Sequence, residues 1–104
     1  MLVAFSIAPS GGDNRDASVH DAVAAAVEVV RRSGLPHRTD SMFTTLEGEW
    51  DEVFAVVKEA TEAVGEFGSR VALVLKADIR PGYSGEIDGK LERLEDAVDS
   101  RSQD

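Results

Sequence analysis

The side chains best suited to holding a small molecule lie in residues 39–53, TDSMFTTLEGEWDEV. Thr44 and Thr45 are adjacent, so on a strand they point to opposite faces and one hydroxyl must face the open side of the sheet. A hydroxyl both donates and accepts hydrogen bonds, which suits a heterocycle with ring nitrogens and an amino group. Glu47 could accept two hydrogen bonds or balance a cation. The stretch is therefore a candidate pocket wall.

Trp50, the only tryptophan, leaves two interpretations open. Its apolar repeat with Val53 and Val57 favours a core position, and stacking on a ligand is the alternative. Glu47 and Glu49 also have a plainer interpretation as acids at a helix start, where the positive end of the helix dipole stabilises them. Taken one by one, these residues do not separate a binding site from ordinary structure.

Other kinds of chemistry are poorly supported by the sequence. His20 and His37 have no partners at metal-ligand spacing. The segment GYSGE (82–86) lacks the final glycine of a nucleophile elbow, and PSGGDN (9–14) lacks the lysine of a phosphate-binding loop. Cysteine is absent, which removes disulfides and thiolate chemistry. We expect no enzymatic activity, no metal and no cofactor.

The composition limits the partners of the chain. Its 104 residues suit one domain, and 42% are hydrophobic, which is enough for a modest core. A formal net charge of −9 disfavours nucleic acid and mildly favours a small cation. The start, MLVAFSIAPSGG, has no basic region and too short an apolar run for a signal peptide or membrane span. We expect a cytoplasmic protein that does not bind membranes.

The periodicity of the chain predicts the elements that would position these side chains. Apolar alternation indicates strands at 2–8 and 70–79, with two short strands within 37–47. Helical repeats indicate a helix that begins near Asp16 or Ser18 and ends at Gly34, one at about 49–67, and a terminal helix with apolar residues at 87, 91, 94 and 98. This order predicts an α+β, ferredoxin-like βαββαβ sandwich with an additional C-terminal helix. We expect one domain at 1–98 and a disordered tail at 99–104.

Two helices can cover only one face of such a sheet. Val3, Phe5 and Ile7 should point to the helices. Small, mixed residues remain on the other face, which suits contact with a second sheet better than contact with water. The residues expected there are Ala4, Ser6, Ala8, Val74 and Lys76. We therefore expect the chain to self-associate through this face, with the terminal helix as a second apolar surface.

The chain resembles the small thiamine-binding proteins of the YkoF-like type. The resemblance covers residues 2 to about 95 and lies in the opening strand VAFSIAP, the run VHDAVAAAVEVVRRSGLPHRTDSMFTTLEGEWDEV, and LVLKADIRPG followed by GEIDGKLERLE. Its most specific part is Thr-x-x-Glu-Gly-Glu, here Thr44, Glu47, Gly48 and Glu49.

The resemblance implies a ferredoxin-like subunit that assembles as a dimer of dimers and has no established catalytic activity. It also implies a pocket beside the sheet, between subunits, for thiamine or its hydroxymethylpyrimidine half. The positions that match the pocket motif are Ser6, Thr44, Thr45 and Glu47, with Met42 and Trp50 as weaker candidates. Phe43 departs from the small or amide residue of similar proteins, so its ring should narrow the cavity. The alternative is an oligomeric scaffold or regulatory interaction protein without a functional pocket.

Overall fold

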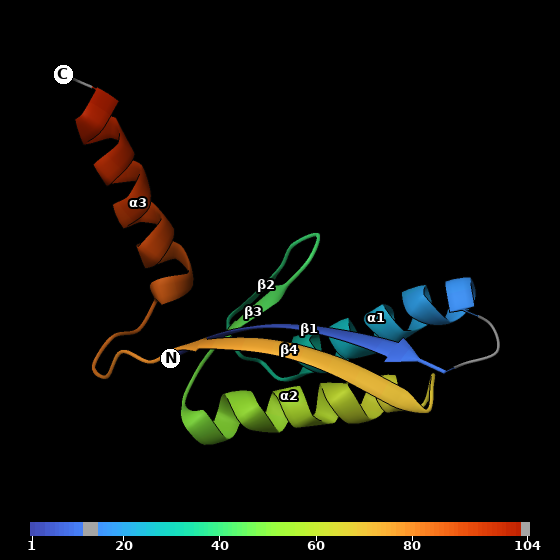
Figure 1. The fold of residues 1–104 in the computed structure, drawn as a ribbon. Helices are drawn as coiled ribbons and strands as arrows, with labels where there is room; N and C mark the ends of the chain where they lie inside the picture. The colour runs from blue at the N-terminus through green and yellow to red at the C-terminus, as the bar shows by residue number, and fades with distance from the viewer. Residues whose placement is uncertain (12–14, 103–104) are drawn as a thin grey trace.

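A computed structural model describes residues 1–11 and 15–102, with side chains described in helix α1 from residue 19 onward. Within these residues the chain forms the expected sequence of strands and helices (Figure 1). Candidate helix caps at Asp16 and Ser18 and part of the 9–14 loop lie outside the described side chains. The elements are β1 (Leu2–Ser10), α1 (Arg15–Arg32), β2 (His37–Thr39), β3 (Thr44–Glu47), α2 (Trp50–Gly65), β4 (Arg70–Asp78) and α3 (Glu86–Ser102).

The strands form an antiparallel sheet in the order β2-β3-β1-β4. Its register confirms the predicted faces, because Val3 is opposite Leu46 and Ala77, whereas Ala4 is opposite Thr45 and Lys76. Helices α1 and α2 both lie on the first of these faces (Figure 1). The α+β, ferredoxin-like architecture predicted from the sequence is therefore confirmed. Neither α1 nor α2 lies on the second face, which is called the open face.

The core lies between the sheet and these two helices. Val3, Leu46, Val53, Ala60 and Val64 are completely excluded from solvent. The helical repeat of α1 predicts one apolar face of Val19, Val23, Ala26, Val27 and Val30. Ala26 and Val30 are buried, whereas Val19 and Val23 are 44% and 46% exposed. The sequence of this helix is apolar on nearly every side, so its repeat fits two faces equally well. The face that packs inward keeps Ala26 and Val30 but adds Ala22 and Val29 in place of Val19 and Val23.

Helix α3 projects away from the rest of the molecule (Figure 1). None of its residues is buried, and the radius of gyration of 16.1 Å exceeds the roughly 13 Å of a compact domain of this size. Helix α3 continues through Ser102, which places residues 99–102 in a helix where the sequence suggested a tail. Residues 103–104 lie outside the described part. The position of α3 must therefore be set by contacts near its first turn.

Candidate functional site

A groove of about 280 Å³ lies between the start of α3 and the open face. Thr45 lines it from β3, Ile87 and Leu91 from α3, and Leu2 from β1. The open-face position of Thr45 decides which of the two neighbouring threonines could meet a ligand there. Charged residues complete the lining, namely Arg38, Asp40, Glu86 and Lys90.

Glu47 fixes one wall of this groove by holding the start of α3. The backbone N–H of Glu86 donates to Glu47 Oε1 and Oε2 at 3.1 and 2.9 Å, and the N–H of Ile87 approaches Oε1 at 3.5 Å. Gly85, with φ of 68°, precedes the helix and has no side chain with which to cap it. The Glu47 carboxylate therefore takes the role of the N-cap from another element. It is only 7% exposed, so these hydrogen bonds form largely out of water.

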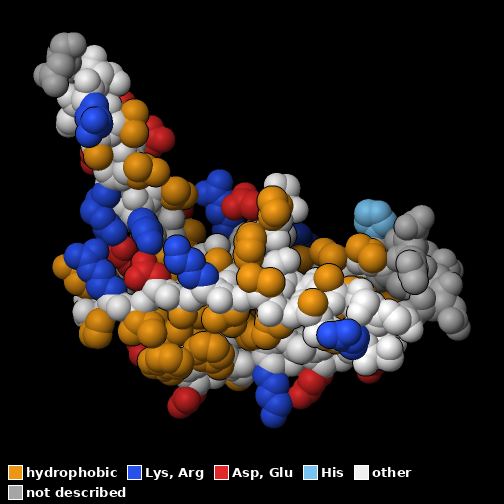
Figure 2. Space-filling model, viewed as in Figure 1, with side chains coloured by type: hydrophobic (Ala, Val, Ile, Leu, Met, Phe, Trp, Pro, Cys, Tyr) orange, Lys and Arg blue, Asp and Glu red, His pale blue; other side chains and the backbone are white. Residues whose placement is uncertain are grey.

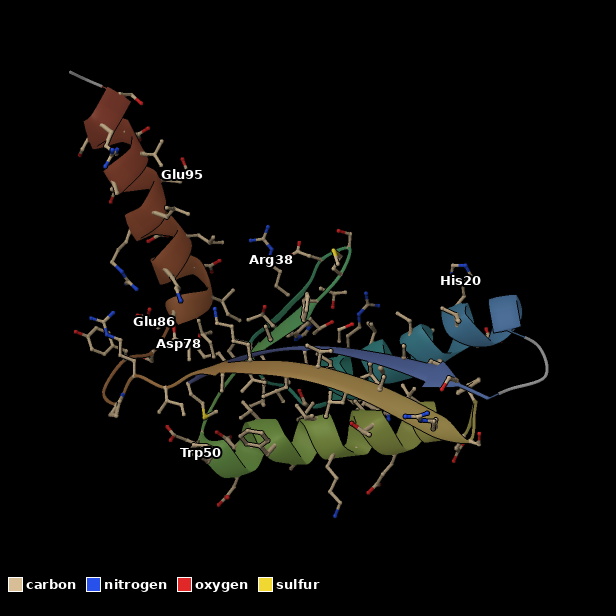
Figure 3. The ribbon with its side chains drawn as sticks, in the orientation of Figure 1. His20, Arg38, Trp50, Asp78, Glu86 and Glu95 are labelled. Atoms are coloured by element: carbon tan, nitrogen blue, oxygen red, sulfur yellow. The ribbon has the colours of Figure 1, made fainter. Side chains whose placement is uncertain are left out.

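Two ion pairs flank this cap and shift the titration of their carboxyl groups. Lys90 Nζ lies 2.7 Å from Asp78 Oδ2, and its hydrogen bond and charge lower the pKa of Asp78. Arg93 contacts Glu86 across the first turns of α3, and its hydrogen bond lowers the pKa of Glu86. Both carboxyl groups are therefore held in their charged form. The pair of Lys90 with Asp78 joins α3 to β4, whereas Glu86 and Arg93 both belong to α3. Figure 3 shows Asp78 and Glu86 close together at this junction.

The other predicted site residues lie elsewhere. Ser6, Met42 and Thr44 line a second groove of about 270 Å³ between β1, α1 and the β2–β3 turn, and Phe43 forms part of its wall. Thr44 is buried on the helix-covered side, where its hydroxyl lies 3.2 Å from that of Thr39. The six candidates therefore do not form one pocket.

Trp50 lines a third hollow with Met1, Ile79 and Tyr83, and its ring stacks on Phe54 with centroids 5.0 Å apart. It is 53% exposed, so the interpretation that favoured a core position is wrong. Trp50 is the first residue of α2, ahead of the first buried residue of that helix, Val53. The apolar repeat identified the correct helix but could not show where the core ends.

Sequence reasoning missed the contribution of α3 to the site. Glu86 and Lys90 were recognised only as part of the segment GEIDGKLERLE, yet both line the groove beside Thr45. A signal existed in Gly85, since a glycine before an acidic, amphipathic helix leaves that helix without a cap of its own. What the sequence could not show is that Glu47, 39 positions away from Glu86, supplies it.

In the described residues no group of three or more His, Cys, Asp or Glu side chains is placed to hold a metal ion. Over the same residues no helix combines the length and the apolarity needed to span a bilayer. His37 accordingly has an ordinary local role, because its Nδ1 lies 2.9 Å from the carbonyl oxygen of Leu35.

The comparison with protein families settles the family. The profile that describes thiamine-binding proteins matches residues 3–95. The chain belongs to this thiamine-binding protein family. The match includes β3, the groove and the first half of α3, so the region around Thr45 and Glu47 is part of the shared domain.

Relatives and solved structures agree with this assignment. The chain is 46% identical over 96 residues to the UPF0045 protein Mb1933 of Mycobacterium bovis, and the match covers 91% of each chain. The structure of protein MJ1052 from Methanocaldococcus jannaschii is 35% identical, with a TM-score of 0.79, and the match covers 90% of this chain and 94% of that one. A Thermotoga maritima structure, named provisionally as a thiamine biosynthesis/salvage protein, is 26% identical with a TM-score of 0.69 over 84% and 91% of the two chains.

Proposed function

We propose that this protein binds thiamine, or its hydroxymethylpyrimidine half, in the groove between α3 and the open face, without catalysing a reaction. The observation that carries the proposal is the pairing of Thr45 and Glu47 on one face of β3, beside a groove, in a member of the thiamine-binding family. The Thr45 hydroxyl can donate and accept hydrogen bonds with an aminopyrimidine. Glu47 contacts the groove residues Glu86 and Ile87 and places negative charge next to them.

The charges around the groove favour a cation without phosphate groups. Arg38 lies 3.6 Å from Asp40, and Lys90 lies 2.7 Å from Asp78, so each basic side chain in the lining already has an acidic partner. A phosphate would need positive charge in excess of the acidic groups around it, and the charges of these pairs already balance. The net charge of −9 also favours a cation over an anion. We therefore infer that the ligand is unphosphorylated.

A second copy of the chain would complete the site. The groove volume of about 280 Å³ is at the small end for a ligand pocket, and one of its sides is open to solvent. The sheet that forms its floor continues into small residues, Ala4, Ser6 and Ala8, which can approach another sheet closely. We propose that the open faces of two copies meet, that the ligand lies at this seam, and that the cytoplasmic assembly is a dimer of dimers.

Calorimetric titration of thiamine and of hydroxymethylpyrimidine tests the proposed site. Thr45→Val keeps the shape of the side chain but removes the hydroxyl, and we expect it to weaken binding about tenfold, the value of one hydrogen bond. Ser6→Ala removes a hydroxyl from the second groove and is the matched control, which should bind as the unchanged protein does. Glu47 is a poorer probe, because its replacement would also release α3.

Comparing Thr45→Val with Ser6→Ala shows which of the two grooves holds the ligand. If Ser6→Ala weakens binding and Thr45→Val does not, the ligand occupies the groove beside α1, where Phe43 and Met42 form the wall. If neither ligand produces heat or thermal stabilisation at millimolar concentration, the binding proposal fails. Thermal unfolding with and without each ligand provides a second measurement, since a ligand that binds only the folded chain raises the melting temperature.

A role in assembly alone is a second candidate, and α3 favours it. Leu91, Leu94 and Val98 form an apolar stripe along this helix and are 43%, 56% and 47% exposed. Exposed stripes of this kind mark surfaces that contact another protein. An oligomer that binds neither ligand and dissociates when Leu94 is replaced by a charged residue would support a scaffold function in place of ligand binding.

A further inference from the structure

Strand β4 forms an edge of the sheet and lacks the features that protect edges. It runs for nine residues, and β1 is its only strand neighbour among residues 1–11 and 15–102. Its register with β1 is continuous, so no bulge turns the edge away, and the strand contains no proline and one lysine, Lys76. Leu73 and Val74 are 42% and 59% exposed. Such an edge presents unpaired backbone N–H and C=O groups that can pair with another strand.

We propose that β4 pairs antiparallel with β4 of a second copy, about a two-fold axis at Val74, and joins two sheets edge to edge. Two-fold symmetry places residue 74 of one copy opposite residue 74 of the other. The residue numbers of every other opposite pair must then add up to 148. This register alone uses all nine residues of both strands. The pairs are Arg70 with Asp78, Val71 with Ala77, Ala72 with Lys76, and Leu73 with Leu75.

The charges of the strand support this register. Arg70 and Asp78 both lie on the open face, at opposite ends of β4, so the pairing sets each guanidinium against a carboxylate of the other copy. Lys90 bonds Oδ2 of Asp78 and leaves Oδ1 for such a partner. In the described residues no carboxylate of the same chain pairs with Arg70. Shifting the register by one step to a sum of 146 would instead set Arg70 against Lys76.

The side chains beside the strand provide further contact area. Figure 2 shows hydrophobic side chains gathered along β4 and the start of α2, on the side that faces the viewer. Trp50, Ile79 and Tyr83 are 53%, 51% and 48% exposed near this edge. Edge pairing brings the α2 helices of both copies to the same side of the joined sheet. The proposed seam is distinct from the stacking of open faces and does not rest on ligand binding.

Cysteine crosslinking tests both the partner and the register, because the chain contains no natural cysteine. Opposite residues in an antiparallel pair have Cα atoms about 4.5–5.5 Å apart, within the range of a disulfide, whereas stacked sheets are about 10 Å apart. Oxidised Val74→Cys should therefore give a covalent dimer on a denaturing gel. Ala72→Cys and Lys76→Cys should each remain monomeric alone and crosslink only when mixed.

Charge reversal gives a second measurement on an intact edge. Arg70→Glu sets like charges against each other at both ends of the seam and should raise the dissociation constant of the dimer roughly tenfold in sedimentation. Arg31→Glu, on α1, makes the same change in net charge and should leave association unchanged. The proposal is overturned if oxidised Val74→Cys stays monomeric while retaining its circular dichroism, if Ala72→Cys crosslinks alone as well as Val74→Cys does, or if the two charge variants associate equally.

Discussion

The two faces of the sheet are stabilised by different kinds of interaction. On the helix-covered face, fully buried residues such as Val3, Leu46 and Val53 pack between the sheet and two helices. On the open face, α3 has no buried residue and is held by a carboxylate cap from Glu47 and by the ion pair between Lys90 and Asp78 of β4. The first face depends on apolar area removed from water, and the second on a few directional polar contacts.

The contrast explains where a binding site can form. A close-packed core leaves no room for a ligand and tolerates little movement. A helix attached only at its first turn leaves a groove along the sheet, and its walls can move without disturbing the core. Figure 3 shows this arrangement, with the polar junction at one end of α3 and the labelled Glu95 farther along the helix. The proposed function therefore lies on the side of the molecule with the weaker packing.

The largest effect should come from the packed face. Leu46→Ala removes a completely buried side chain from β3 and leaves a cavity. We therefore expect the free energy of unfolding to fall by about 2–5 kcal/mol. Urea denaturation followed by circular dichroism measures this change. A loss below about 1 kcal/mol would show that the two faces do not differ as proposed.

A smaller effect should follow when the cap of α3 is weakened. Glu47→Gln keeps an acceptor but removes the charge, which should weaken its bonds to the N–H groups of Glu86 and Ile87 by about 1 kcal/mol. Hydrogen exchange at these two amides should accelerate about fivefold, while exchange in β1 should not change. Glu95→Gln on the exposed side of α3 is the control. Equal exchange in both variants would rule out a cap at Glu47.

Acid should loosen the junction of α3 without first affecting the core. Because the ion pairs lower the pKa values of Asp78 and Glu86 below their usual 3.8 and 4.5, their contribution is complete above those values and disappears as the pH falls through the lowered ones. Lys90→Met should raise the pKa of Asp78 toward 3.8. Carboxyl NMR titration of both proteins measures this shift, and identical titration curves would contradict the assigned pairing.

The smallest effect should come from the exposed stripe of α3. Leu94 is 56% exposed, so Leu94→Ala should change the unfolding free energy of the single chain by less than about 0.5 kcal/mol. The same change should weaken the proposed assembly, in which the stripe is covered. Measuring the unfolding free energy at two protein concentrations distinguishes these effects, because only the stabilisation that comes from association depends on protein concentration. A loss of several kcal/mol at the lower concentration would mean that α3 packs into its own subunit.

Local periodicity was enough to predict the elements and the alternation of the strands. Two-residue periodicity placed Phe5 and Leu75 on one face and Ser6 and Val74 on the other, and the register confirms this. It failed on α1, where alanine and valine occupy nearly every side, and at Trp50, where a correct helical repeat runs past the end of the core. In both cases the pattern shows which residues can be buried but not what covers them.

The sequence by itself determined the order of the elements, the alternation of the strand faces and most of the apolar core, because each follows from the spacing of neighbouring residues along the chain. Only the tertiary structure decided that Thr44 points into the core, that Ser6 and Thr45 line separate grooves, and that Glu47 caps α3. Those results depend on strand register and on contacts between residues far apart in the sequence, which no local pattern specifies.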